Sequence, residues 1–183
     1  MRILGVDSSG MVASVALVED DLLVAEYSVN YKKTHSQTLL PMLDEIVKMT
    51  ELDLNTIDAI AVAAGPGSFT GLRIGAATVK GLGLALEKPV ISVPTCHGLA
   101  YNLWGSDKLI CPIMDARRSQ VYTGIYEFTK DGMQVLLDQS AMDIRALAEK
   151  LNAMGREVIF LGDGCPVYES VLAECMQVPY AFA

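Results

Sequence analysis

The chain has 183 residues, of which 51% are hydrophobic and 20% are charged. This length suits one ordinary domain or two small ones, and the composition is typical of a chain with a buried core rather than a disordered one. The formal net charge is −8, from 14 basic and 22 acidic residues. Proteins that bind nucleic acid on their own usually present a basic face, so the charge disfavours that class.

The four cysteines are isolated from one another and form no C-x-x-C pair; they are Cys96, Cys111, Cys165 and Cys175. We expect reduced, buried thiols in a cytoplasmic protein. No apolar run approaches the ~20 residues of a membrane span, and no signal peptide precedes the first predicted strand. The expected location is therefore the cytoplasm, without a membrane partner.

The first half of the chain predicts the order β-β-β-α-β-α-β-α. Three strands at Arg2–Asp7, Val12–Val18 and Leu22–Val29 are separated by short polar turns, which is typical of an antiparallel meander. The later elements are a helix at Ser36–Met49, a strand at Ala59–Ala63, a helix at Thr70–Leu86, a strand at Pro89–Val93 and a helix at Pro94–Tyr101. Either Thr34 or Ser36 is expected to cap the first helix, and Ser68 or Thr70 the second.

The second half repeats this order as β-β-β-α-β-α. Its predicted strands are Leu109–Met114, Gln120–Phe128, Gln134–Leu137 and Glu157–Leu161, with helices at Asp143–Ala153 and from Gly164 to about Met176. Two tandem units of similar order indicate a duplicated α/β architecture. We expect one subdomain at residues 1–103 and the other at residues 104–183.

The two long helices predicted in the first half have an unusual distribution of apolar, charged and glycine residues. The apolar residues of the first helix span an arc of about 180°, wider than the ~100° stripe that packing on one side needs. The second helix is rich in glycine, and its only charges are Arg73 and Lys80, seven residues apart. Each interior glycine costs about 1 kcal/mol, and close approach by another element is the usual compensation. The second helix is therefore predicted to be buried or to form an interface.

The stretch from Val62 to Gly75 leaves a predicted strand, passes through Gly65-Pro66-Gly67 and enters the second helix. Such a turn brings free backbone N–H groups together at the N-terminus of a helix. The partial positive charge there suits a phosphate. A junction that binds nothing explains the same spacing equally well. The stretch is neither a Walker A loop nor a G-x-G-x-x-G fingerprint.

Several segments resemble the TsaB family (also called YeaZ), which takes part in making N6-threonylcarbamoyladenosine, t6A, in tRNA. The segments are 3–9 (ILGVDSS), 35–41 (HSQTLLP), 65–75 (GPGSFTGLRIG) and 115–122 (DARRSQVY). The resemblance implies the ASKHA fold of actin, hexokinase and Hsp70. It also implies a longer chain, so whether a last strand or helix is missing beyond Pro179–Ala183 stays open.

In this fold the first hairpin and the second glycine-rich turn flank a nucleotide's phosphates. The resemblance thus implies a vestigial nucleotide site made of Asp7, Ser8, Ser9, Gly65, Gly67, Ser68 and Gly71. The related enzyme TsaD binds metal through a His-x-x-x-His pair, whose positions here hold Thr95 and Leu99, with His97 between them. One histidine beside Cys96 is a poor metal site, so neither a metal site nor a catalytic residue is predicted. His35 is expected to be a helix-terminus histidine.

The resemblance implies a non-catalytic scaffold that binds TsaD through its first two long helices, in the threonylcarbamoylation of adenosine 37 of tRNA. The expected interface residues are Leu39, Leu40, Met42, Leu43, Ile46, Val47, Thr70, Arg73, Ile74, Gly75 and Thr78. ATP or ADP and metal are expected on TsaD, TsaE joins the complex, and tRNA binds only through it. Without TsaD, the same helices are expected to form a homodimer.

Two alternatives remain open. One is a small ASKHA-fold ATPase or kinase that uses Asp7 and the Gly65–Gly71 turn; the other is an autonomous tRNA-binding module. Asp7 is more simply explained as a hairpin-end residue that accepts backbone N–H groups. Arg117 and Arg118 either contact phosphate or form a charged turn with Asp115, and the second explanation is favoured. Gly162-Asp163-Gly164 suits either an adenosine contact or a strand-ending turn.

Overall fold

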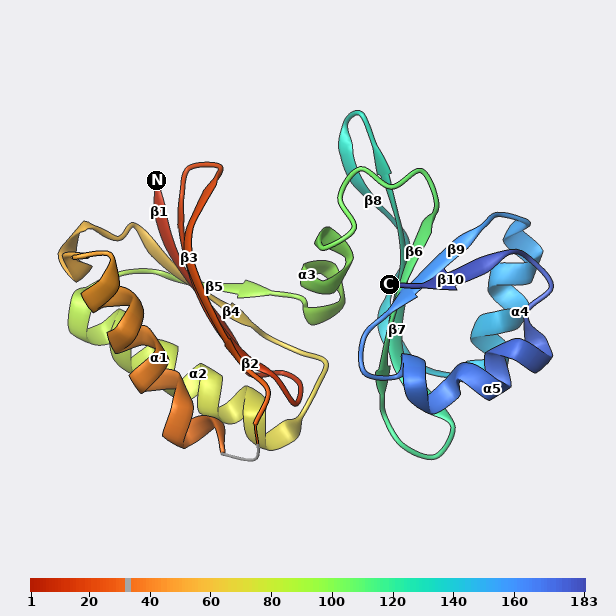
Figure 1. Ribbon diagram of the computed structural model, residues 1–183, viewed down its shortest axis with the longest axis horizontal. Helices are drawn as coiled ribbons and strands as arrows, with labels where there is room; N and C mark the ends of the chain where they lie inside the picture. Colours follow the sequence, from red (N-terminus) through yellow and green to blue (C-terminus); the bar gives the residue numbers. More distant parts are fainter. Residues whose placement is uncertain (32–33) are drawn as a thin grey trace. The chain divides into compact units, whose positions relative to one another are not determined.

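The computed structural model describes residues 1–31 and 34–183. The chain divides into two compact units, residues 1–95 and 96–183 (Figure 1). Each unit contains one five-stranded sheet. Within the described residues, no helix combines the length and apolar character needed to cross a membrane.

The first unit holds a mixed sheet and the two long helices. Its elements are β1 (Arg2–Asp7), β2 (Ala13–Glu19), β3 (Leu22–Val29), α1 (His35–Met49), η1 (Leu54–Thr56), β4 (Ala59–Ala63), α2 (Phe69–Leu86) and β5 (Val90–Val93). The strand order is β3-β2-β1-β4-β5. β1, β2 and β3 form the predicted antiparallel meander, whereas β4 and β5 run parallel to β1.

The core of this unit lies between the sheet and its two helices. Alternate residues of β1 and β2, such as Leu4, Val6 and Val15, are buried against α1 and α2. Alternation with a period of two is what a sheet with one covered face requires.

The second unit repeats this topology. Its elements are α3 (Thr95–Tyr101), β6 (Leu109–Asp115), β7 (Gln120–Thr129), β8 (Gly132–Asp143), α4 (Ile144–Met154), β9 (Val158–Leu161), α5 (Cys165–Cys175) and β10 (Tyr180–Phe182). The strand order β8-β7-β6-β9-β10 matches that of the first unit, strand for strand. The predicted duplication is thus confirmed.

The sheet of the second unit is covered on both faces. Leu109, Cys111 and Ile113 of β6 pack into one core cluster with α4 and α5, while Ile110 packs into another with α3. The sequence of a strand that is buried on both faces is a continuous apolar run, without the alternation of a strand that has one exposed face. This explains why residues 109–114 are all buried.

Two strands differ from the sequence prediction. β8 covers twelve residues, although only Gln134–Leu137 was predicted. The strand is largely exposed, and its pairing with β7 continues as far as Asp143, which lies opposite Gln120. The segment after α5 was not predicted to be a strand, but Tyr180–Phe182 forms β10 and pairs parallel to β9.

The boundary between the two units differs from the expected one. A boundary after residue 103 would place α3 in the first unit, yet Cys96 and Ala100 of α3 pack in a core cluster of the second unit.

Candidate functional site at the glycine-rich turn and the paired helices

The glycine-rich turn is joined to the first hairpin by hydrogen bonds. Ser68 caps α2, as predicted, because its hydroxyl accepts a bond from the Gly71 N–H at 3.3 Å. The Ser68 N–H in turn donates to the Ser9 carbonyl at 2.6 Å. The turn therefore holds the start of α2 against the loop between β1 and β2.

Close approach by neighbouring segments explains most of the interior glycines of α2. The Ser8 hydroxyl donates to the Gly71 carbonyl at 2.9 Å. A Cβ at Gly71 would stand 2.0 Å from the Ser8 carbonyl oxygen, and one at Gly75 would stand 2.4 Å from the Ser8 hydroxyl. Gly83 likewise makes room for Val90. The predicted compensation for glycine is thus present at three of the four positions, and Gly81 has open space instead.

The residues of the expected nucleotide site do come together, but they bind one another. Asp7 accepts the Ser9 N–H at 2.7 Å, which is the hairpin-end arrangement considered above. Ser8 and Ser9 are buried. The Gly65 N–H donates to the Thr95 hydroxyl at 3.1 Å. Ser9 also fills the space beside Gly67, where a Cβ would meet its carbonyl oxygen at 2.3 Å.

The histidines serve packing and hydrogen bonding. His35 opens α1, and its Nε2 lies 2.9 Å from the Gly10 carbonyl oxygen, so it ties the helix to the same hairpin. The His97 ring meets the edge of Tyr126 at 5.1 Å between centroids. Among residues 1–31 and 34–183, no cluster of three or more His, Cys, Asp or Glu side chains has the arrangement of a metal site.

The cysteines are all free, with Cys96 and Cys111 fully buried and the other two partly buried. Burial raises the pKa of Cys96 and of Cys111 to about 12 and that of Cys165 to about 11. These thiols are protonated at neutral pH, and a thiol is a far weaker nucleophile than a thiolate.

The hairpin between β6 and β7 carries the two arginines. Asp115 accepts the Arg117 N–H at 2.9 Å and the Tyr168 hydroxyl at 2.8 Å. The Arg117 guanidinium lies 3.6 Å from the other carboxylate oxygen. These contacts form the predicted charged turn for Arg117, whereas no contact between Arg118 and Asp115 is found among the described residues. The backbone N–H of Arg117, then the Tyr168 hydroxyl and the Arg117 charge, lower the pKa of Asp115.

Two further features of this hairpin were not predicted. Arg117, Arg118 and Ser119 all have left-handed φ values, of 69°, 54° and 60°. Tyr168 of α5 also holds the hairpin from 53 positions away in the chain, a pairing that periodicity cannot reveal. Asp163 accepts the Asp115 N–H at 3.2 Å, so the turn at residues 162–164 closes onto the end of β6.

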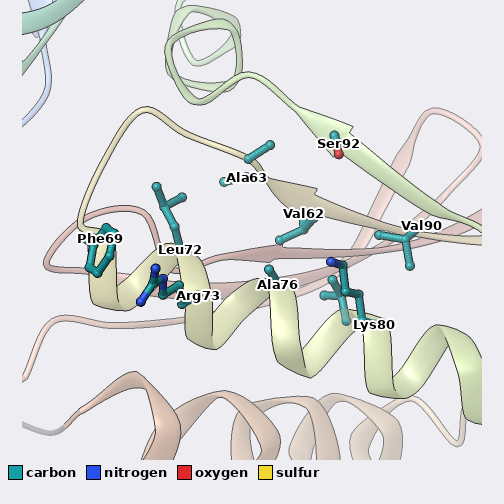
Figure 2. A pocket seen from close by; sticks show the side chains of 11 residues that line it. Val62, Ala63, Phe69, Leu72, Arg73, Ala76, Lys80, Val90 and Ser92 are labelled. Atoms are coloured by element: carbon teal, nitrogen blue, oxygen red, sulfur yellow. The ribbon is translucent and has the colours of Figure 1, made fainter.

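α2 is neither fully buried nor fully exposed. Its buried stripe consists of Gly71, Gly75, Val79 and Gly83, one residue per turn. On one flank of the helix, beside β4 and β5, lies a groove of about 350 Å³ (Figure 2). Phe69 and Leu84 are 69% and 83% exposed. Exposed apolar side chains mark an interaction surface where they form a contiguous patch, so these two make the outer side of α2 a candidate for one.

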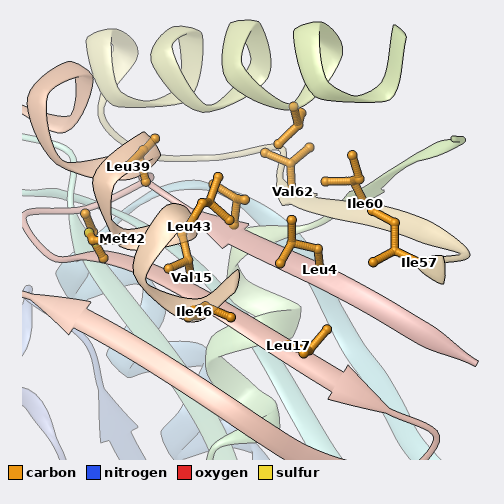
Figure 3. Packing of buried hydrophobic residues seen from close by; sticks show 13 residues of the cluster. Leu4, Val15, Leu17, Leu39, Met42, Leu43, Ile46, Ile57, Ile60 and Val62 are labelled. Atoms are coloured by element: carbon orange, nitrogen blue, oxygen red, sulfur yellow. The ribbon is translucent and has the colours of Figure 1, made fainter. Parts of the chain in front are cut away.

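α1 divides its apolar arc between the core and the surface. Leu39, Met42, Leu43 and Ile46 are buried between α1 and the sheet (Figure 3), so these four expected interface residues serve the unit's own core. The same arc leaves Leu40 and Met49 55% and 77% exposed.

The remaining expected interface residues lie at different depths. Val47, Ile74 and Thr78 are partly buried, Thr70 and Arg73 are exposed, and Gly75 is buried. The surface that α1 and α2 leave available is therefore narrower than the predicted set.

The chain matches the family model described as "TsaD: tRNA N6-adenosine threonylcarbamoyltransferase" over residues 23–181. It is 36% identical over 178 residues to the tRNA threonylcarbamoyladenosine biosynthesis protein TsaB of Bacillus subtilis. That match covers 96% of this chain and 77% of the relative.

Solved structures agree with these matches. YeaZ from Pseudomonas aeruginosa superposes with a TM-score of 0.79 at 29% identity, covering all of this chain and 83% of that one. The ROK hexokinase of Thermus thermophilus superposes with a TM-score of 0.51 at 13% identity, covering all of this chain and 92% of that one. The second likeness concerns the fold alone, and it confirms the predicted ASKHA architecture.

Proposed function

The chain belongs to the TsaB family of tRNA threonylcarbamoyladenosine biosynthesis proteins, which carry a TsaD-like domain, and we propose that it acts there as a non-catalytic partner of TsaD. The observation that carries this proposal is the exposed apolar surface of α1 and α2. Leu40, Met49, Phe69 and Leu84 all project from these two helices into solvent. An apolar surface of this kind is stabilised when another protein covers it.

The two helices offer this surface together. They begin close to one another, because a Cβ at Gly71 of α2 would lie 3.2 Å from the His35 ring at the start of α1. On α2, Thr70, Ala77 and Leu84 recur every seven residues and so share one outward face. Two helices of TsaD laid across this face would complete a four-helix interface. In the absence of TsaD, a second copy of this chain would cover the same face.

A scaffold role also fits the contacts at the first hairpin. Ser8, Ser9, Ser68 and Gly71 direct several of their polar groups at one another, as described above. We propose that the catalytic nucleotide and metal are held by TsaD, that TsaE joins the complex, and that tRNA binds only to the assembled complex.

Co-purification with TsaD tests the proposal. Leu84→Glu and Leu40→Glu each place a charge in the proposed interface and should abolish the complex without changing the circular dichroism of the chain. Leu22→Glu is the matched control, because Leu22 is a leucine of the same unit, outside both helices, whose exposure lies between those of Leu40 and Leu84. Gly75 is unsuitable for substitution, since any side chain there would meet Ser8.

A complex that survives both helix variants would overturn the proposed interface. Calorimetric titration with ATP and Mg²⁺ tests the other half of the proposal. Micromolar binding with turnover by the isolated chain, lost in Asp7→Ala, would contradict a non-catalytic role.

A further inference from the structure

The groove beside α2 adjoins the proposed TsaD interface and shares Phe69 and Arg73 with it, but its floor lies on another flank of the helix. Its floor is apolar and comes from Val62, Leu72, Ala76 and Val90, and Figure 2 shows these side chains between the helix and the two strands. Leu72, Ala76 and Lys80 recur every four residues and form one flank of α2. Thr70, Ala77 and Leu84 lie on the neighbouring outward face.

The groove lies between α2 and the last two strands of the sheet. β5 lies at the sheet edge and pairs with β4 alone among the described strands. Val90 of β5 is about two-fifths exposed, and Ser92, two residues further along the same face of the strand, also lines the groove. At one end the groove closes where Gly83 meets Val90. The space along β5 therefore has the position of a third helix beside α1 and α2.

The rim of the groove is positively charged although the chain carries a net charge of −8. Arg73 and Lys80 line it, and no carboxylate does. Within the described part of the chain, neither residue takes part in an ion pair. The Arg73 guanidinium lies 3.8 Å above the centroid of the Phe69 ring. Stacking of this kind orders the guanidinium and leaves its N–H edge available to a carboxylate.

We propose that this groove docks an amphipathic helix of a partner protein, with two carboxylates seven residues apart. Arg73 and Lys80 are separated by two helical turns, or about 10.5 Å. A helix lying along α2 has the same rise per residue, so acidic side chains one heptad apart meet both cations. Its apolar stripe fills the groove floor and covers Val90, as helix-in-groove recognition requires. The docked helix thus extends the α1–α2 layer over the sheet edge.

A pair of synthetic helices tests this proposal on the full chain. Each is an 18-residue peptide with leucines at helical spacing and a staple on its outer face. One carries glutamate at two positions seven apart, and the other carries lysine there. In fluorescence anisotropy at low salt, the glutamate peptide should bind about tenfold more tightly than the lysine peptide, since two exposed charge pairs change sign. Amide shifts in NMR spectra should map to α2 and β5.

Charge reversal in the protein gives the decisive comparison. Lys80→Glu should weaken binding of the glutamate peptide, while Lys150→Glu, an equal charge change at an exposed site on α4, should leave it unchanged. Arg73→Glu combined with Lys80→Glu should reverse the preference in favour of the lysine peptide. Equal affinity for both peptides, an equal loss in the Lys150→Glu variant, or shifts outside the groove would each overturn the proposal. So would pairing of the peptide as an extended strand along β5. None of these results depends on binding to TsaD.

Discussion

Single residues decide how closely α2 approaches the first hairpin. Gly71→Ala would force a Cβ to within 2.0 Å of the Ser8 carbonyl oxygen, which is backbone and cannot rotate away. We expect a loss of about 2–4 kcal/mol in the free energy of unfolding, at or above the usual range for overpacking. Urea denaturation followed by circular dichroism measures it.

Gly81→Ala on the same helix is the matched control. Outside the helix's own backbone, no atom of the described residues lies within 4 Å of the Cβ position at Gly81, so alanine should stabilise the chain by up to about 1 kcal/mol through helix propensity. If both alanine variants shift stability in the same direction, close packing of α2 on the hairpin is wrong.

The Tyr168–Asp115 hydrogen bond predicts a dependence of stability on pH. The pKa of Asp115 is lowered in the folded state, so its contribution is present above about pH 4 and is lost as the pH falls through the folded value. Tyr168→Phe should therefore cost about 1.5–3 kcal/mol at pH 7, the range for a bond to a charged group, and less near pH 3. Urea titrations followed by Trp104 fluorescence measure both values.

The same bond has an effect at high pH. Burial, together with Asp115, raises the pKa of Tyr168 to about 12. Its contribution is full below the unfolded value of about 10 and declines between pH 10 and 12. Tyr168→Phe should remove this decline, whereas Tyr122→Phe should keep it, since Tyr122 has no hydroxyl hydrogen bond among the described residues. An unchanged profile in Tyr168→Phe would contradict the assignment.

At the scale of elements, the N-terminus of α4 has a side-chain cap and that of α1 does not. The Asp143 carboxylate accepts the N–H groups of Arg145 and Ala146 at 2.9 and 3.3 Å at the start of α4. Thr34 holds the same position before α1, but its side chain makes no capping bond. We expect Asp143→Ala to cost about 1 kcal/mol and Thr34→Ala to cost a few tenths at most. Equal costs in denaturant titrations would show that the cap does not stabilise α4.

Periodic patterns predict most elements of this chain. The predicted helix Thr70–Leu86 and strand Ala59–Ala63 agree with α2 and β4 to within one residue, because their apolar spacing and the glycine turn between them are local signals. β10 has only three residues and is stabilised by pairing with β9, so no local pattern reveals it. The wide apolar arc of α1 did not indicate which of its residues face the core and which remain exposed.

At the scale of the whole molecule, the candidate site could be predicted only in part. The sequence resemblance brought the first hairpin and the Gly65–Gly71 turn together, and the structure places Ser8 and Ser9 of that hairpin in contact with the turn. The groove could not be predicted, since it depends on how far α2 lies from the edge strand β5. The role of Tyr168 could not be predicted for a similar reason, because its hydrogen-bond partner Asp115 is distant in sequence. Contacts between distant segments depend on topology, which a single sequence does not specify.

The net charge of the whole molecule limits what it can bind alone. At −8, the chain repels the phosphates of RNA, and nonspecific binding depends on releasing counterions with basic side chains. In filter binding at about 150 mM salt, we expect the isolated chain to bind tRNA more weakly than ~100 µM, the weak end of nonspecific affinities. The same filters should retain tRNA once TsaD is added.

Arg117 and Arg118 supply the sharpest form of this test, because they form an exposed basic pair on the β6–β7 hairpin. If the isolated chain instead bound tRNA at micromolar concentrations, the logarithm of affinity should fall steeply with the logarithm of salt concentration. Replacing both arginines with alanine should then reduce that slope by about two, one for each phosphate that is no longer neutralised. That result would make this hairpin an RNA-binding element independent of TsaD. A flat salt dependence would leave Arg117 with its structural contacts to Asp115 and both arginines with their places in the left-handed turn.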